Sequence, residues 1–195
     1  ILIPLMLIGS FGFSQNPGDS IFNSSQIHTV KLYFNQPSWW DSLVAYYPLD
    51  KKMLASMEVD GLWFDSVGAQ FKGNSSYNNT SQKKPFKIDL NEYVDGQVLD
   101  GMDKFNLNNG FKDPTFMREK LTLDFCRRHG LPAPRCTYAN LYLNDTLWGL
   151  YTFIEQVDKT FLQTEFSDND GNLFKGDPVG SLQWYGNMDT SYYNR

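Results

Sequence analysis

Short segments in which apolar and polar residues alternate constrain the fold of this chain more than any other feature. Val30, Leu32 and Phe34 alternate with Lys31 and Tyr33, which places the three apolar side chains on one face of a strand. Further segments that favour strands cover residues 57–59, 67–71, 86–90, 105–107, 137–143 and 147–154. The chain is therefore expected to consist mainly of short strands with one buried face.

Turn and helix signals separate these strands. Asp60-Gly61 predicts a β-hairpin turn, and Asn144-Asp145 predicts a second turn between two later strands. Short helices are expected at residues 38–47, before Pro48, and at residues 158–166.

The strongest helix signal begins at Asp113, which is expected to cap the helix. Met117, Leu121 and Phe125 recur every fourth residue, so they predict a buried apolar face. Gly130 is expected to end the helix. Several antiparallel strands, one long helix and two more strands predict an α+β fold, in which an antiparallel sheet packs against this one main helix.

The composition suits a single folded unit and argues against binding to polyanions. The chain has 195 residues, of which 41% are hydrophobic, so it is long enough to form a core. It contains 22 Asp and Glu against 17 Lys and Arg, giving a net charge of −5. Nonspecific binding to nucleic acid or to an anionic membrane is therefore not expected as its main activity.

The first residues resemble the remains of a secretory signal. Residues 1–14 form an apolar run that ends in small residues, and residues 15–29 are polar and predict a linker. A buried strand or a membrane anchor would be the alternatives, but a run of this length is too short to span about 30 Å of hydrocarbon. A secreted or cell-surface protein is therefore expected.

Cysteine and histidine content limits the metal and redox chemistry. Cys126 and Cys136 are the only cysteines, and an exported chain would allow either one disulfide between them or two free thiols. His28 and His129 are the only histidines and are far apart in the sequence. No zinc site is expected.

Six sequence blocks occur in an order that resembles a known family. They are FKGNSS (71–76), KKPFKIDL (83–90), DP-x-x-MREKL (113–121), GLPAPR (130–135), LYLND-x-x-WGLYTFIEQVDKTFL (141–162) and GNLFKGD (171–177). Together they resemble the CotH kinase family of secreted or spore-coat proteins with an atypical kinase-like fold. One departure is Lys72, where the family pattern usually has Arg, so the charge is kept without the bidentate guanidinium.

This resemblance implies a domain plan and a cofactor. Residues 30–165 would form the N-lobe of an atypical protein kinase, and residues 166–195 would begin a truncated C-terminal lobe. ATP with a divalent metal, Mg or Mn, is the implied cofactor. The implied activity is phosphoryl transfer to Ser or Thr of exported proteins. The catalytic and metal-binding carboxylates are expected in the C-terminal lobe, so this chain alone is not expected to be active.

The residues themselves are compatible with a phosphate-binding loop. Gly73, Ser75 and Ser76 are small residues after a strand, where backbone N–H groups can approach phosphate, although an ordinary hairpin loop is the alternative. Lys87 is the first choice for a phosphate-pairing lysine and Lys84 the second, although either could lie on a solvated strand face. Lys72 adds a further positive charge beside the loop.

Two glutamates complete the candidate site. Glu119 in the main helix is expected to pair with the strand lysine and hold it toward the phosphates. A solvated Glu119, or one paired with Arg118, is the alternative. Glu155 ends the last strand, where backbone groups would meet the adenine edge. Asp158 nearby is alternatively a helix cap.

Two other classes of function stay open. One is a surface or coat protein that keeps the fold without catalysis. The other is a carbohydrate-binding or carbohydrate-hydrolysing module, suggested by the aromatic residues Trp39, Trp148, Trp184 and Tyr185. Hydrolysis would require two facing carboxylates, and the sequence offers no persuasive pair.

Overall fold

The computed structural model describes residues 16–171 and 173 of the chain. The strands are β1 (His28–Tyr33), β2 (Met53–Val59), β3 (Leu62–Phe71), β4 (Phe86–Asp89), β5 (Lys104–Asn108), β6 (Cys136–Leu143) and β7 (Thr146–Glu155). The helices are α1 (Asp19–Phe22), α2 (Trp39–Tyr46), the 3-10 helix η1 (Tyr47–Leu49), α3 (Arg118–Arg128) and α4 (Lys159–Phe166). The expected signal, residues 1–14, lies outside the described residues, as does most of the expected C-terminal lobe.

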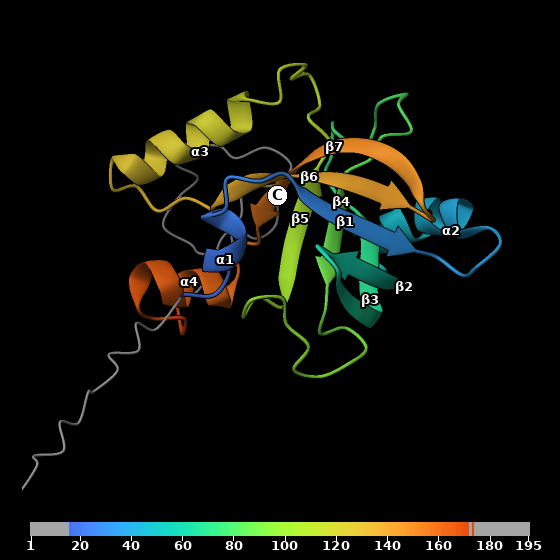
Figure 1. Cartoon of the computed structure of the whole chain (residues 1–195), viewed down its shortest axis with the longest axis horizontal. Coiled ribbons are helices and arrows are strands. Elements are labelled where there is room, and N and C mark those ends of the chain that lie inside the picture. The colour runs from blue at the N-terminus through green and yellow to red at the C-terminus, as the bar shows by residue number, and fades with distance from the viewer. Residues whose placement is uncertain (1–15, 172, 174–195) are drawn as a thin grey trace, which may run out of the picture.

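These strands form a closed barrel in the order β1-β2-β3-β4-β5-β7-β6. Neighbouring strands are antiparallel except at one seam, where β1 runs parallel to β6. At this seam His28 pairs with Ala139 and Leu32 with Leu143. Figure 1 shows β1 and β6 side by side, with α3 and α4 at one end of the barrel and α2 at the other.

The predicted fold class, an antiparallel α+β sheet with one packed helix resembling a kinase N-lobe, is wrong. The strands are close to the expected positions, but their sheet is mixed and closes on itself. Alternation shows which face of a strand is buried but not which distant strand it pairs with. The seam joins segments that are more than 100 residues apart, so no turn signal in the sequence could indicate it.

The alternating side chains fill the interior of the barrel. Along β1 the even-numbered residues are buried and the odd-numbered ones are half-buried. Phe153 of β7 is fully buried, and its ring centroid lies 4.4 Å from that of Phe105 and 5.7 Å from that of Phe22. Aromatic rings from the neighbouring strands β5 and β7 and from α1 therefore pack together in the core.

The segment before β1 is part of this core. Residues 19–22, within the stretch expected as a linker, form α1, and Ile21 and Phe22 are buried. His28 is 1% exposed, and its ring nitrogens contact the Ile21 carbonyl at 2.9 Å and the Asp60 carboxylate at 2.6 Å. These contacts hold α1 against one end of the barrel.

The main helix differs from its prediction in both its start and its packing. α3 begins at Arg118, because Asp113 uses its carboxylate to accept N–H groups of Thr115 and Arg118 in the preceding turn. None of its residues is fully buried. The side chains expected to face the sheet, Met117, Leu121 and Phe125, are all more than half exposed. The helix therefore lies at the end of the barrel with its apolar side outward.

The two cysteines are free thiols in this structure. Cys136 is buried, which raises the pKa of its thiol to about 12, and Cys126 is half-buried. In the described part of the chain, no helix has the length and apolar character needed to cross a membrane.

Truncation of the central aromatic residue should cost most of the stability of the barrel. We expect Phe153→Ala to lower the free energy of unfolding by about 3–5 kcal/mol, because it removes a fully buried ring and leaves a cavity. The control Leu62→Ala removes a side chain that is 54% exposed and should change the free energy by no more than about 0.5 kcal/mol. Urea denaturation of both variants measures the difference, and equal losses would contradict this account of the core.

Candidate functional site

A cavity of about 420 Å³ opens where the β3–β4 loop, the end of β5 and the start of α3 meet. Polar and charged side chains form much of its wall. Its lining residues are Lys72, Gly73, Ser76, Asn108, Asn109, Gly110, Phe111, Lys112, Asp113, Arg118, Glu119 and Thr152. Four of the eight predicted cofactor-binding residues, Lys72, Gly73, Ser76 and Glu119, lie here.

Asn108 brings the lysine and the glutamate of this cavity together. The amide nitrogen of Asn108 donates to Glu119 at 2.7 Å, and its amide oxygen accepts from Lys72 Nζ at 3.3 Å. Asn108 ends β5, Lys72 follows β3 and Glu119 lies in the first turn of α3. The structure therefore links Glu119 to Lys72 and not to the expected lysine of β4, Lys87.

Burial dominates the electrostatics of Glu119. Removal from water raises the pKa of the Glu119 carboxyl above its ordinary value, and hydrogen bonds from Asn108 and Thr152 and the charge of Lys72 oppose this rise. The carboxylate is thus held in a partly dry pocket beside a cation. The attraction between Glu119 and Lys72 is stronger in this partly dry pocket than it would be in water. Glu119 is therefore suited to orienting the lysine.

The loop after Lys72 has backbone donors without acceptors. Within residues 16–171, the N–H groups of residues 73–76 donate to no acceptor, while those of Lys72 and Tyr77 do. Gly73 has a φ of 82°, and a Cβ atom there would lie 2.2 Å from Ser76 Oγ. The positive φ therefore favours glycine at this position, and any larger residue would also require the Ser76 side chain to move. Ser75 is exposed in the same loop but does not line the cavity.

Side chains from other elements hold the carbonyl groups of this loop. The Tyr47 hydroxyl donates to the Gly73 carbonyl at 2.5 Å, and Asn109 Nδ2 donates to the carbonyls of Ser76 at 3.1 Å and Lys83 at 2.6 Å. Asn109 is only 8% exposed. Asn108 and Asn109 could not be predicted as site residues from the sequence, because an Asn-Asn pair after a strand is more typical of a turn.

The two lysines that were preferred from the sequence do not line the cavity. Lys84 Nζ donates to the carbonyls of Tyr77 and Asn79, both at 2.7 Å, so it holds the loop from behind. Lys87 is half-buried on β4, where its strand neighbours are Gln70 and Asn106. Of these two, only Lys84 contributes to the geometry of the loop.

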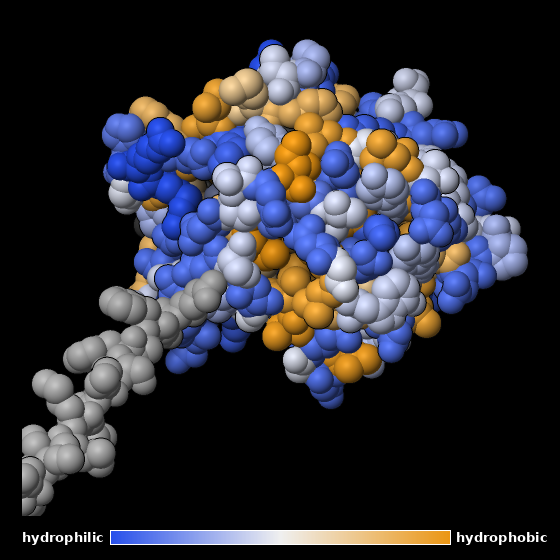
Figure 2. Space-filling model, in the orientation of Figure 1, coloured by the Kyte–Doolittle hydropathy of each residue, from blue (hydrophilic) through white to orange (hydrophobic). Residues whose placement is uncertain are grey.

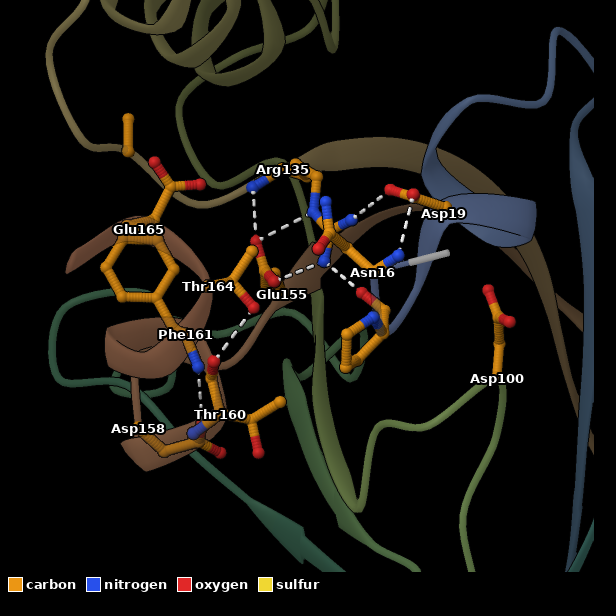
Figure 3. A network of polar contacts seen from close by, with 12 residues as sticks. Asn16, Asp19, Asp100, Arg135, Glu155, Asp158, Thr160, Phe161, Thr164 and Glu165 are labelled. Carbon is orange, nitrogen blue, oxygen red and sulfur yellow. Dashed lines mark hydrogen bonds and ion pairs between the residues drawn. The ribbon is translucent and has the colours of Figure 1, made fainter. Parts of the chain in front are cut away.

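Glu155 belongs to a separate buried network (Figure 3). Its carboxylate accepts from Arg135 Nε at 3.1 Å and Nη2 at 2.5 Å, and Arg135 Nη1 donates to Asp19 at 2.8 Å. Arg135 and Glu155 are 8% and 3% exposed in their side chains. This network ties β7 to the segment before β6 and to α1, and Asp158 nearby caps α4. The Glu155 side chain is therefore a structural group here.

Of the aromatic residues considered for carbohydrate binding, the two that the structure describes, Trp39 and Trp148, do not form an exposed platform. Trp39 stacks on Phe34 with centroids 5.0 Å apart, and Trp148 lies 5.6 Å from Trp40. All three tryptophans are half-buried against the core. Trp184 and Tyr185 lie outside the described residues.

Metal ligands do not gather in the part of the chain that the structure describes. No three His, Cys, Asp or Glu residues in it lie close enough to hold an ion. Asp113 at the cavity wall is occupied by Thr115 and by the backbone of Arg118.

Comparison with known proteins matches the region that forms this site. A family model described as CotH kinase protein matches residues 69–195. The inner spore coat protein H of Bacillus subtilis (strain 168) is 29% identical over 113 residues. This match covers 58% of the chain and 30% of that relative, so the chain spans less than a third of the relative's length.

Neutralising Glu119 should stabilise the protein in a pH-dependent way. A carboxyl whose pKa is raised in the folded state destabilises the fold once it ionises, so Glu119→Gln should unfold at a higher temperature than the parent at pH 7. The difference should shrink as the pH falls toward 4, because the parent's carboxyl then becomes protonated. Thermal unfolding at both pH values measures it. A variant that is less stable than the parent at pH 7 would contradict the assignment.

Proposed function

This chain belongs to the CotH kinase protein family, and we propose that its cavity binds the phosphates of ATP in a protein kinase that acts on Ser or Thr of exported proteins. The single observation that carries the proposal is the 73–76 loop, whose N–H groups donate to no acceptor among the described residues and whose Gly73 and Ser76 line the cavity together with Lys72. Backbone N–H groups together with a lysine are the usual ligands of nucleotide phosphates.

The loop is suited to this task because its donors are fixed before any ligand arrives. Tyr47, Asn109 and Lys84 hold the carbonyl groups of the loop and its continuation through hydrogen bonds of 2.5–3.1 Å. These carbonyl oxygens are thereby already engaged as acceptors, which fixes the conformation of the loop. Preorganised donors lose little entropy on binding, so they add affinity.

Lys72 would supply the positive charge, and Asn108 and Glu119 would orient it. Asn108 contacts both charged groups, so the lysine ammonium is held within the cavity wall. Lys112 and Arg118 also line the cavity and are exposed, which adds positive potential toward solvent. A net charge of −5 would otherwise repel a nucleotide from this chain.

The implied cofactor includes a divalent metal, Mg or Mn, whose chemistry when bound would be to neutralise negative charge on the phosphates. The described residues fit the phosphates better than the metal, because no cluster of three ligating side chains occurs among them. The metal-binding carboxylates and the catalytic base would therefore come from the C-terminal lobe implied by the resemblance. The chain by itself would bind nucleotide without transferring phosphate.

Substitution of the two lysines separates this proposal from the sequence-based choice. We expect Lys72→Ala to weaken the binding of magnesium ATP at least about tenfold, because it removes a charge-assisted contact of about 1.5–3 kcal/mol. The matched control Lys87→Ala should change the Kd less than about twofold. Isothermal titration calorimetry on the 195-residue chain measures both. Equal affinities in the parent and in Lys72→Ala, or a loss confined to Lys87→Ala, would overturn the proposal.

A structural role in a spore coat or cell surface is the second candidate. It is supported by the name of the Bacillus subtilis relative, which describes a coat protein. In this role the cavity would bind no nucleotide, so the same titration distinguishes the two candidates. For either candidate we propose a location at a coat or surface, which the name of the Bacillus subtilis relative supports.

A further inference from the structure

One side of α3 forms an exposed apolar ridge that nothing in the described structure covers. Met117, Leu121, Phe125 and Leu131 are 51%, 58%, 60% and 55% exposed. The first three are spaced by four residues, so they align along one face of the helix and extend for about 12 Å. Figure 2 shows hydrophobic side chains along the upper edge of the molecule, where Figure 1 places α3.

A row of exposed apolar side chains along one helix face needs an explanation, whereas a single exposed apolar residue needs none. Scattered apolar side chains are normal on protein surfaces, whereas a continuous apolar face on an amphipathic helix marks a contact. The opposite side of α3 is already in use, because Glu119 contacts Asn108 and Lys120 donates to the Cys136 carbonyl at 3.0 Å. The ridge is thus the face left for a partner.

A segment of the same chain is tethered close to the apolar ridge and is a candidate partner for it. Arg127 of α3 and Glu165 of α4 form an ion pair of 2.6 Å, so the end of α4 lies beside the C-terminal part of α3. Residues 174–195 follow shortly after α4 and provide 22 residues, which extended would reach about 70 Å. They can therefore reach every position of the ridge.

Residues 174–195 contain many side chains suited to packing against the apolar ridge of α3. No charged residue occurs in residues 178–188, and the segment carries eight large apolar or aromatic side chains. These are Phe174, Val179, Leu182, Trp184, Tyr185, Met188, Tyr192 and Tyr193. The family match covers residues 174–195 together with most of the barrel strands.

We propose that residues 174–195 dock on the apolar ridge of α3 within the same chain. Burial of Leu121 and Phe125 would fix the position of α3. Because Glu119 lies on the same helix and lines the cavity, the segment would also hold one wall of the candidate site. This inference does not depend on whether the cavity binds a nucleotide.

Photocrosslinking tests the proposal on the 195-residue chain. Phe125 is replaced by p-benzoylphenylalanine, and the matched control carries the same group at Leu62, which is 54% exposed on β3. Trypsin releases position 125 in peptide 121–127 and the docking segment in peptide 176–195. Equal amounts of chain with natural and with heavy nitrogen are mixed before irradiation, so that crosslinks within one chain differ in mass from those between chains.

The expected result is a crosslink between peptides 121–127 and 176–195 within one chain, which position 62 does not give. A crosslink to 176–195 only between heavy and light chains would show a second copy on the ridge and would overturn the proposal. The absence of this crosslink, or an equal yield from position 62, would overturn it as well.

Discussion

Parallel pairing of β1 with β6 is the interaction on which the rest of the structure depends. Without it the strands would form an open sheet with two edges, whereas the seam from His28↔Ala139 to Leu32↔Leu143 closes the barrel. Closure removes unpaired strand edges and lets side chains from all seven strands meet in one core. It also draws in the N-terminal segment, because His28 at the start of β1 contacts Ile21 and Asp60.

The candidate site follows from this closure. Once β3, β5 and β7 are held at fixed positions around the barrel, Lys72, Asn108 and Thr152 come together although they are distant in sequence. α3 then adds Glu119 from outside the barrel. The site is therefore formed by strand ends and one helix start, while the buried Arg135–Glu155 pair stabilises a neighbouring part of the structure.

The sequence predicts where the strands and turns lie, but it does not predict which distant strands pair with one another. Alternation located the strands, and the Asp60-Gly61 turn located the first hairpin, because these signals act between close neighbours. The parallel seam and the outward ridge of α3 depend on contacts between distant segments. Local motifs predicted Gly73, Ser76 and Glu119 for the candidate site, and all three line the cavity. Lys87 ranked ahead of Lys72 in the sequence because the position of a lysine relative to the cavity depends on distant contacts. Strand position alone did not reveal that Asn108 would join Lys72 to Glu119.

The central claim is that the backbone of residues 73–76 binds phosphate, and amide chemical shifts test it most directly. Titration of the nitrogen-15 labelled chain with magnesium ATP should shift the amide resonances of residues 73–76 most strongly, because their N–H groups have no acceptor in the described structure. Inorganic triphosphate should shift the same resonances. Unchanged resonances at 73–76, with shifts elsewhere or nowhere, would contradict the account.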